Sequence, residues 1–226
     1  MAIELIIFDL DGTLADTKLD LANAVNATRA RFDLPPLPNE DVYSYVGNGA
    51  PVLIRRALGP QFSEEEIQTG LDYFLARYKE HMLDHTTLYP GVPESLDRLT
   101  AGGVKMAILT NKPVRFSQMI VDGLGVGDHF FRVYGGNSFA SKKPDPEGVY
   151  ALLSEAGVPK ENALMVGDSA VDVRTARNAG IAVCGVTYGF QPETLAAEPP
   201  DILVERFSDL ADMVIADRNP KGAFPH

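Results

Sequence analysis

Short apolar runs alternate with helical patterns along most of this chain, and this alternation constrains the fold more than any other feature. Six runs rich in Ile, Val and Leu have the length of buried parallel strands. Strands that alternate with helices predict a doubly wound, Rossmann-like parallel α/β sheet, with sites at the carboxyl ends of the strands. The predicted strands are residues 4–9, 105–110, 132–134, 163–168, 182–186 and 201–204.

The interval between the first two strands breaks this rhythm. Residues 15–85 show helical patterns and no convincing strand, and about 70 helical residues are too many for a simple crossover. Ser63 and Glu66 form a capping-box pattern ahead of a long amphipathic stretch. We therefore predict an α/β core of residues 1–14 and 88–218, an inserted all-helical cap subdomain over 15–87, and a flexible tail over 219–226.

The charge balance excludes several classes of partner. Lys and Arg total 20 against 31 Asp and Glu, so the net charge is −11. Nucleic acids and anionic membranes repel a chain this acidic, and its apolar runs are too short for a membrane helix. The single cysteine excludes an intrachain disulfide framework. We expect a cytoplasmic protein with no nucleic-acid or membrane partner; its oligomeric state is not indicated by the sequence.

Two carboxylates follow the first predicted strand. Strand alternation predicts that Asp9 and Asp11 leave the sheet on the same side, and Gly12 permits a sharp turn there. Neighbouring carboxylates resist ionisation unless a cation lies between them, and Mg²⁺ prefers oxygen ligands. The pattern therefore indicates a Mg²⁺ site, or alternatively an acidic turn at a strand end.

Three other strand ends carry polar residues. Thr110 and Asn111 precede a predicted helix, where they suit a phosphate oxygen or simply cap that helix. Lys143 precedes a proline that fixes the local backbone, so its ammonium is either aimed at a site or solvated. Asp168 and Asp172 lie four residues apart, and helix capping by Asp168 or Ser169 explains only part of that pattern. Because the strand ends of such a sheet face one crevice, the conjunction indicates a metal and phosphate site.

Taken in chain order, these residues resemble the four motifs of the haloacid dehalogenase superfamily, and the resemblance spans residues 3–215. The helical insertion is similar to the cap that one subclass carries between its first two motifs. Within that subclass the chain is most similar to the phosphoglycolate phosphatases. The four motifs are Asp9-Leu10-Asp11-Gly12-Thr13, Thr110-Asn111, Lys143-Pro144 and Gly167-Asp168-Ser169 with Asp172. The closer similarity rests on Gly47-Asn48-Gly49-Ala50, Thr110-Asn111-Lys112-Pro113, Gly135-Gly136, Lys142-Lys143-Pro144 and Gly185-Val186-Thr187-Tyr188-Gly189.

The resemblance implies an enzyme that hydrolyses small phosphorylated metabolites, most specifically 2-phosphoglycolate. It implies that Asp9 attacks phosphorus to form an aspartyl-phosphate, and that Asp11 acts first as the acid and then as the base. Mg²⁺ would bind the Asp9 carboxylate, the Asp11 backbone carbonyl and Asp168, with Asp172 in support. The phosphoryl oxygens would be held by Thr110, Asn111 and Lys143.

Other functions remain open on the same motifs. A sugar-phosphate mutase would use Asp9 and Asp11 but return the phosphate to the substrate, and other phosphatases would act on pyrophosphate or sugar phosphates. A receiver-like signalling module also has an acidic Mg²⁺ pocket with a Thr and a Lys. The chain length, the helical insertion and Asp11 in the acid position disfavour that module.

We expect the insertion to choose the substrate. The loop Gly47-Asn48-Gly49 leads into a predicted helix, whose N-terminal N–H groups can receive a substrate carboxylate. Arg56, further along that helix, suits the same anion if it turns inward. The alternative is that the arginine is solvated and the glycines merely begin a helix.

Overall fold

A six-stranded parallel sheet lies at the centre of the computed structural model, which describes residues 2–218. The strand order is β5-β4-β1-β6-β7-β8, so the winding direction reverses beside β1. In open α/β sheets, ligand sites lie outside the carboxyl ends of the strands at such a reversal. The strands are β1 (Leu5–Phe8), β4 (Lys105–Leu109), β5 (Arg132–Tyr134), β6 (Ala163–Gly167), β7 (Ala182–Val186) and β8 (Ile202–Val204).

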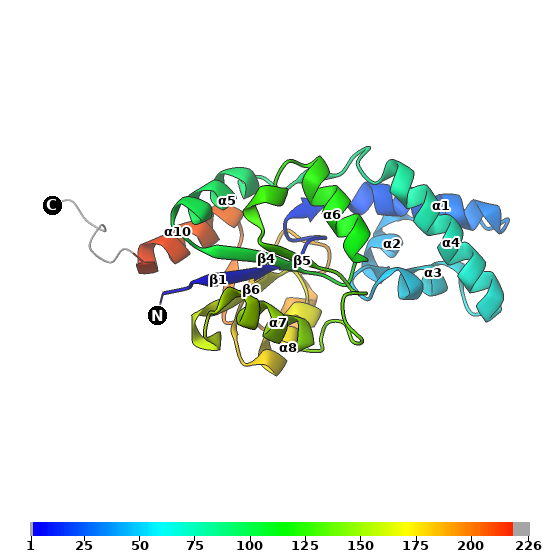
Figure 1. Ribbon diagram of the computed structural model, residues 1–226. Helices are drawn as coiled ribbons and strands as arrows, with labels where there is room; N and C mark the ends of the chain where they lie inside the picture. The colour runs from blue at the N-terminus through cyan, green and yellow to red at the C-terminus, as the bar shows by residue number, and fades with distance from the viewer. Residues whose placement is uncertain (1, 219–226) are drawn as a thin grey trace.

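Helices cover both faces of the sheet (Figure 1). Ile6 and Phe8 face α5, α6 and α10, whereas Leu5 and Ile7 face α7 and α8. All four residues of β1 are fully buried, which explains why the central strand is an uninterrupted apolar run. The helices of this core are α5 (Val92–Ala101), α6 (Val114–Gly123), α7 (Glu147–Ala156), α8 (Ala170–Ala179), α9 (Thr194–Ala197) and α10 (Phe207–Arg218), with short 3₁₀ turns at η1 (Gly127–His129) and η2 (Lys160–Asn162).

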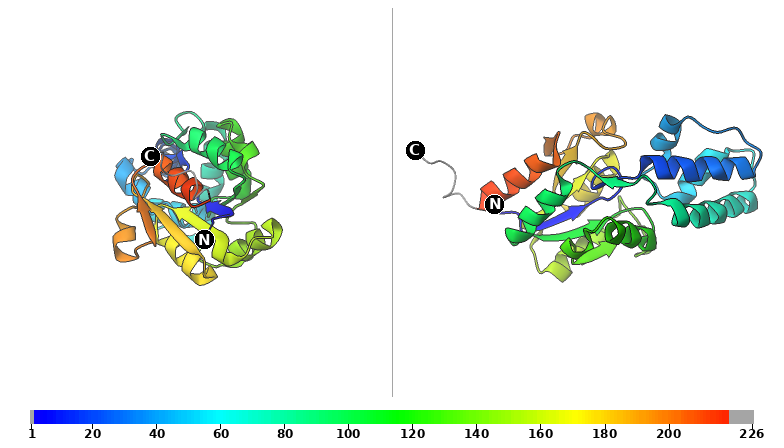
Figure 2. Two further views of the ribbon diagram at one scale, coloured as in Figure 1. Left: turned by 90° about the vertical axis from the view of Figure 1, so that its left-hand side faces the viewer. Right: turned by 90° about the horizontal axis from the view of Figure 1, so that it is seen from above.

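Four helices form the insertion between β1 and β4. They lie beyond the carboxyl ends of the strands, as the right-hand view of Figure 2 shows. The longest helix begins at the predicted capping box, where the Ser63 side chain accepts from the backbone N–H of Glu66 at 3.3 Å. The predicted fold, a doubly wound sheet with an inserted helical cap, is confirmed. The inserted helices are α1 (Lys18–Arg31), α2 (Asn39–Tyr45), α3 (Ala50–Leu58) and α4 (Glu64–His81).

Two short antiparallel strands, of two residues each, lie where the chain leaves and re-enters the core. β2 (Ala15–Asp16) pairs with β3 (Thr87–Leu88). The sequence predicts no strand over residues 15–85. β2 lies in that range and is not predicted, because two residues give no periodic signal. The boundaries at 15 and 87 stay a prediction, and the predicted tail at 219–226 lies outside the described residues. Within residues 2–218, no helix is both long and apolar enough to cross a bilayer.

Candidate active site

Three neighbouring strands end in polar residues that the sequence singles out. Asp9 follows β1, Thr110 follows β4 and Asp168 follows β6. β1 pairs in parallel with both β4 and β6, so the three residues emerge at one edge of the sheet. The parallel topology therefore brings together residues that are distant in the chain.

Lys143 lies between two carboxylates at this edge. Its Nζ is 3.0 Å from Asp9 Oδ1 and 2.7 Å from Asp172 Oδ1, and its side chain is only 2% exposed. Burial lowers the pKa of this ammonium, but Asp172 and Asp9 outweigh burial and raise the pKa above its ordinary value. Lys143 is therefore a charged, buried residue, and the alternative of a solvated surface lysine does not hold.

Asp172 has a structural role beside its contact with Lys143. The backbone N–H and hydroxyl of Ser169 donate to Asp172 Oδ2 at 3.2 and 2.8 Å, which forms the capping box of α8. One carboxylate oxygen thus begins the helix while the other holds the ammonium. The capping alternative, which named Asp168 or Ser169, is correct for Ser169, whose partner is Asp172, and it coexists with the contact to the site.

Asp9, Asp168 and Asp172 form an acidic cluster in which each contributes an oxygen, all within 4.8 Å of one another. Burial raises the pKa of Asp9 to about 6, although Lys143 opposes the shift. Burial, followed by the charges of Asp172 and Asp9, raises the pKa of Asp168 to about 8. One ammonium does not balance three carboxylates, so the cluster needs a further positive charge. A hard divalent cation such as Mg²⁺ fits these oxygen donors.

Two glycines give Asp168 its place in the cluster. A Cβ on Gly12, whose φ is +83°, would meet Asp168 Oδ2 at 2.3 Å. A Cβ on Gly189 would meet the Asp168 Cβ at 2.2 Å. Asp168 Oδ2 is oriented by the backbone N–H of Phe190, which donates at 2.6 Å. The loop after β7 therefore closes over the acidic cluster and aims one of its carboxylates.

The Asp11 carboxylate is not among the three that group in this cluster, although its charge raises the pKa of Asp9, and its sharing of a cation with the Asp9 carboxylate stays a prediction. Asp11 Oδ1 accepts from Thr17 Oγ1 at 2.6 Å, and Lys112 Nζ contacts both Asp11 oxygens at 3.0 and 3.1 Å. β1 ends at Phe8, before either aspartate, so strand alternation alone does not set the directions of the two side chains. The two carboxylates therefore occupy different electrostatic environments. Metal binding through the Asp11 backbone carbonyl stays a prediction.

Lys112 is the site residue that sequence reasoning missed. Its Nζ also donates to the hydroxyl of Tyr78 on α4 at 2.9 Å and lies 4.6 Å from the centre of that ring. Burial lowers the pKa of Lys112, but Asp11 and Tyr78 outweigh burial and raise it. The available signal was its position directly after Thr110 and Asn111 at a strand end.

Thr110 and Asn111 are both buried at this edge. Thr110 Oγ1 accepts from the backbone N–H of Lys112 at 3.3 Å. Asn111 Nδ2 donates to the carbonyls of Gly47 and Lys143 at 2.9 and 3.1 Å, so it joins the insertion to the core. Their contact with phosphoryl oxygens stays a prediction.

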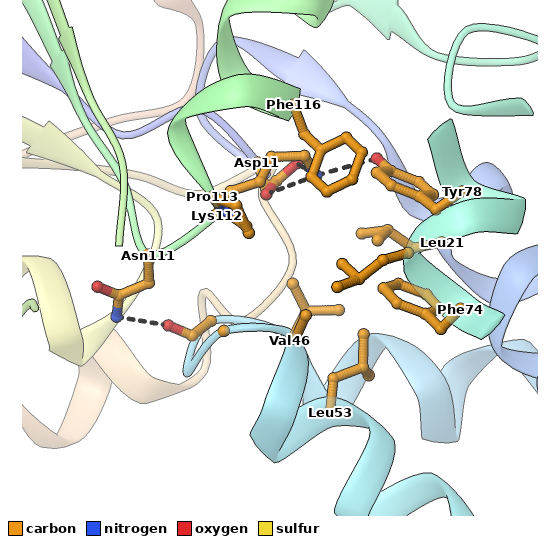
Figure 3. Close-up of a pocket in the computed structure, with 14 residues that line it drawn as sticks. Asp11, Leu21, Val46, Leu53, Phe74, Tyr78, Asn111, Lys112, Pro113 and Phe116 are labelled. Carbon is orange, nitrogen blue, oxygen red and sulfur yellow. Dashed lines mark hydrogen bonds and ion pairs between the residues drawn. The ribbon is translucent and has the colours of Figure 1, made fainter. Parts of the chain in front are cut away.

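A cavity lies between the insertion and the core, next to Asp11 (Figure 3). The space between its walls is about 450 Å³ when the part open to solvent is included. Tyr78 packs between Phe74 and Phe116, with ring centres 5.6 and 5.8 Å away, and forms one aromatic wall. The cavity is lined by Asp11, Leu21, Val46, Gly47, Gly49, Ala50, Leu53, Phe74, Leu75, Tyr78, Asn111, Lys112, Pro113 and Phe116.

Only some of the residues expected to choose the substrate lie at the cavity. Gly47 and Gly49 line the cavity, whereas the Asn48 carbonyl accepts from Lys142 Nζ at 2.6 Å. Arg56 is exposed and is not among the lining residues. Roles for these residues in specificity stay predictions.

The insertion also contacts the loop that covers the acidic cluster. Gln191 Nε2 donates to the carbonyls of Ser44 and Val46, both at 2.9 Å. The backbone N–H of Gln191 lies 3.4 Å from Asp168 Oδ2. One residue therefore links the position of the insertion to a carboxylate of the cluster.

Comparison with known proteins places this geometry in a family. The model of the haloacid dehalogenase-like hydrolases matches residues 6–186. A curated phosphoglycolate phosphatase of Pseudomonas syringae pv. tomato is 41% identical over 208 residues, which are 89% of this chain and 76% of the relative.

Two further relatives match almost end to end. The phosphoglycolate phosphatase of Chromobacterium violaceum is 39% identical, covering 94% of this chain and 96% of its own. A crystal structure from Haemophilus somnus, described as a predicted phosphoglycolate phosphatase, has a TM-score of 0.89 and 35% identity, covering 93% of this chain and 97% of its own. The chain belongs to the haloacid dehalogenase-like hydrolases and is a phosphatase with a helical cap.

Proposed function

We propose that this phosphatase hydrolyses 2-phosphoglycolate to glycolate and phosphate, with Mg²⁺ as its cofactor and Asp9 as its nucleophile. The observation that supports this most is that the two aspartates contact different lysines. Asp9 lies against Lys143 in the acidic cluster, whereas Asp11 faces the cavity with Lys112. A nucleophile must be ionised, and the Lys143 ammonium together with a bound cation favours the ionised form of Asp9.

In the proposed reaction, a bond forms between an Asp9 carboxylate oxygen and phosphorus while the bond to the leaving oxygen breaks. Asp11 donates a proton to that leaving oxygen, and glycolate departs. Asp11 then accepts a proton from the water that attacks the aspartyl-phosphate, which releases phosphate and restores Asp9. Lys143, Thr110 and Asn111 hold the phosphoryl oxygens, where negative charge must be stabilised as the bond breaks.

The donors for Mg²⁺ in this proposal are Asp9, Asp168 and the Asp11 backbone carbonyl, with Asp172 in support. The fit rests on the three carboxylate oxygens within 4.8 Å of one another and on the raised pKa values of Asp9 and Asp168. When bound, the ion offsets the charge of the carboxylates and of the phosphoryl oxygens.

The curated relatives and the cavity support this choice of substrate. The relatives at about 40% identity are named phosphoglycolate phosphatases. The insertion contacts the core through Asn111 and Gln191, so the space beside Asp11 suits a small leaving group. Sugar phosphates, pyrophosphate and the mutase reaction are the competing outcomes. The proposed setting is the cytoplasm, with a small phosphorylated metabolite as the partner.

The test measures phosphate release from 2-phosphoglycolate, a hexose phosphate and pyrophosphate, each in Mg²⁺ and in EDTA. We expect turnover of phosphoglycolate that EDTA abolishes and Mg²⁺ restores. Asp9→Asn should retain the fold, lose turnover and accumulate no covalent phosphate, as measured by mass spectrometry of acid-quenched protein. Undiminished activity in EDTA, transfer of phosphate between sugar positions, or a covalent phosphate on Asp9→Asn would contradict the proposal.

A further inference from the structure

The cavity beside Asp11 has apolar walls and one positive charge. Of its lining residues, all within the described part of the chain, Lys112 alone is a cation. The residue is 8% exposed, and its Nζ makes three contacts, two to the oxygens of Asp11 and one to the hydroxyl of Tyr78. Asp11 already pairs with this ammonium, and no other residue of the lining offers a positive charge to the anion of a substrate.

Asp11 defines where a leaving group must lie. If Asp11 protonates the leaving oxygen, that oxygen lies within hydrogen-bond distance of its carboxyl group. In phosphoglycolate, three covalent bonds separate this oxygen from the nearest carboxylate oxygen, a span of roughly 3–4 Å. Lys112 Nζ is 3.0 Å from Asp11 Oδ1. The ammonium therefore lies where it can reach the carboxylate of a substrate whose ester oxygen meets Asp11.

We propose that Lys112 recognises the carboxylate of the substrate and so selects 2-oxyacid phosphates, an inference that rests on the proposed function. The carboxylate takes the place of one of the two Asp11 oxygens on Nζ, and the remaining contact keeps the acid beside the leaving oxygen. Tyr78 fixes the third N–H of the ammonium, whose three donors are then all used. A leaving group without an anion gains no charge-assisted hydrogen bond here.

The inference assigns to Lys112 the recognition of the substrate carboxylate that the sequence led us to expect of Arg56. That arginine is exposed and outside the cavity lining, whereas Lys112 is buried in it. Lys112 belongs to the core and Tyr78 to the insertion, so the carboxylate is recognised at the boundary between the core and the insertion. Two other roles are possible outcomes of the test: Lys112 only positions Asp11, or Arg56 binds the carboxylate.

The experiment compares two esters that differ only in the anion, 2-phosphoglycolate and 2-hydroxyethyl phosphate. It measures kcat and KM for both with the wild type, Lys112→Met and the matched control Arg56→Met. Lys112→Met should lower the ratio of kcat/KM for phosphoglycolate to that for hydroxyethyl phosphate by about 10- to 100-fold, the range of one charged hydrogen bond. Much of the fall should lie in KM. Arg56→Met should leave the ratio within about twofold, since exposed charges act weakly.

Two outcomes overturn the inference while the wild type hydrolyses phosphoglycolate: an unchanged ratio in Lys112→Met, whether or not both esters are slowed equally, or a fallen ratio in Arg56→Met. A wild type that does not hydrolyse phosphoglycolate overturns the proposed substrate and this inference with it. Should Lys112→Met fail to fold, Lys112→Gln keeps an N–H donor for Asp11 without the charge. The same fall in the ratio is then expected, and an unchanged ratio overturns the inference.

Discussion

The acidic cluster should make the metal-free protein less stable than a variant that lacks one of its carboxylates. Burial, then Asp172 and Asp9, raises the pKa of Asp168 from 3.8 to about 8. The folded protein therefore retains a proton that the unfolded chain releases above pH 4. The free energy of unfolding then falls as the pH rises from about 4 to about 8. Asp168→Asn keeps the shape of the side chain and removes this pH-dependent cost.

The magnitude follows from the two pKa values, at about 1.4 kcal/mol per unit. Ionisation of Asp168 lowers the free energy of unfolding by at most about 2 kcal/mol at pH 5.5 and about 5 kcal/mol at pH 8. The amide oxygen of asparagine can still accept from the backbone N–H of Phe190, which donates to Asp168 at 2.6 Å. The free energy of unfolding that Asp168→Asn gains over the wild type should therefore be up to about 3 kcal/mol larger at pH 8 than at pH 5.5. For a chain of this size, that is about 6–12 °C in Tm.

The assay is thermal unfolding in EDTA at both pH values, with Asp72→Asn, an exposed aspartate on α4, as the control. The control should show no gain that grows with pH. Adding Mg²⁺ should raise the Tm of the wild type more at pH 8 than at pH 5.5, because the ligands must be deprotonated, and should raise that of Asp168→Asn less. If Asp168→Asn melts at or below the wild type at pH 8 in EDTA, the cluster is not the unbalanced set of charges described above.

Two further predictions concern the acid and the closure of the insertion. Asp11→Asn should slow an alkyl phosphate by about 10²- to 10⁴-fold but an activated aryl phosphate less, because a good leaving group needs less protonation; equal losses in steady-state kinetics would show that Asp11 is not the acid. Gln191→Ala removes two hydrogen bonds to the insertion, worth about 1–3 kcal/mol together, and should raise KM at least severalfold with little change in kcat. Gln68→Ala, on the surface of α4, should not change KM, and an unchanged KM in Gln191→Ala would exclude this contact as a closing element.

The sheet could be predicted from the sequence because its signals are local. The run at β1 is apolar at every position, and burial on both faces accounts for it. Once such strands are placed in parallel, the shared edge brings Asp9 and Asp168 together without further information. Lys143 follows the same logic less directly, since its position depends on a loop rather than a strand.

The orientation of Asp11 and the role of Lys112 could not be predicted in this way. Both depend on contacts between elements that have no common period. Asp11 contacts Lys112, and Lys112 is held by Tyr78, which is 34 residues away on α4. A helical stripe predicts that Tyr78 faces the core of the insertion, but it does not predict which core residue meets its hydroxyl.

The contact that closes the insertion also limits the size of the leaving group. Asn111 Nδ2 bridges the carbonyl of Gly47 in the insertion and that of Lys143 in the core. Gly47 is itself part of the cavity wall, so a bulky leaving group would displace it and break this bridge. Water would then enter beside Asp11, where its exclusion strengthens the charges that act on the reacting group. Selection of the leaving group by size and exclusion of water thus both depend on the hydrogen bond from Asn111 to Gly47. Selection of the leaving group by charge depends on Lys112.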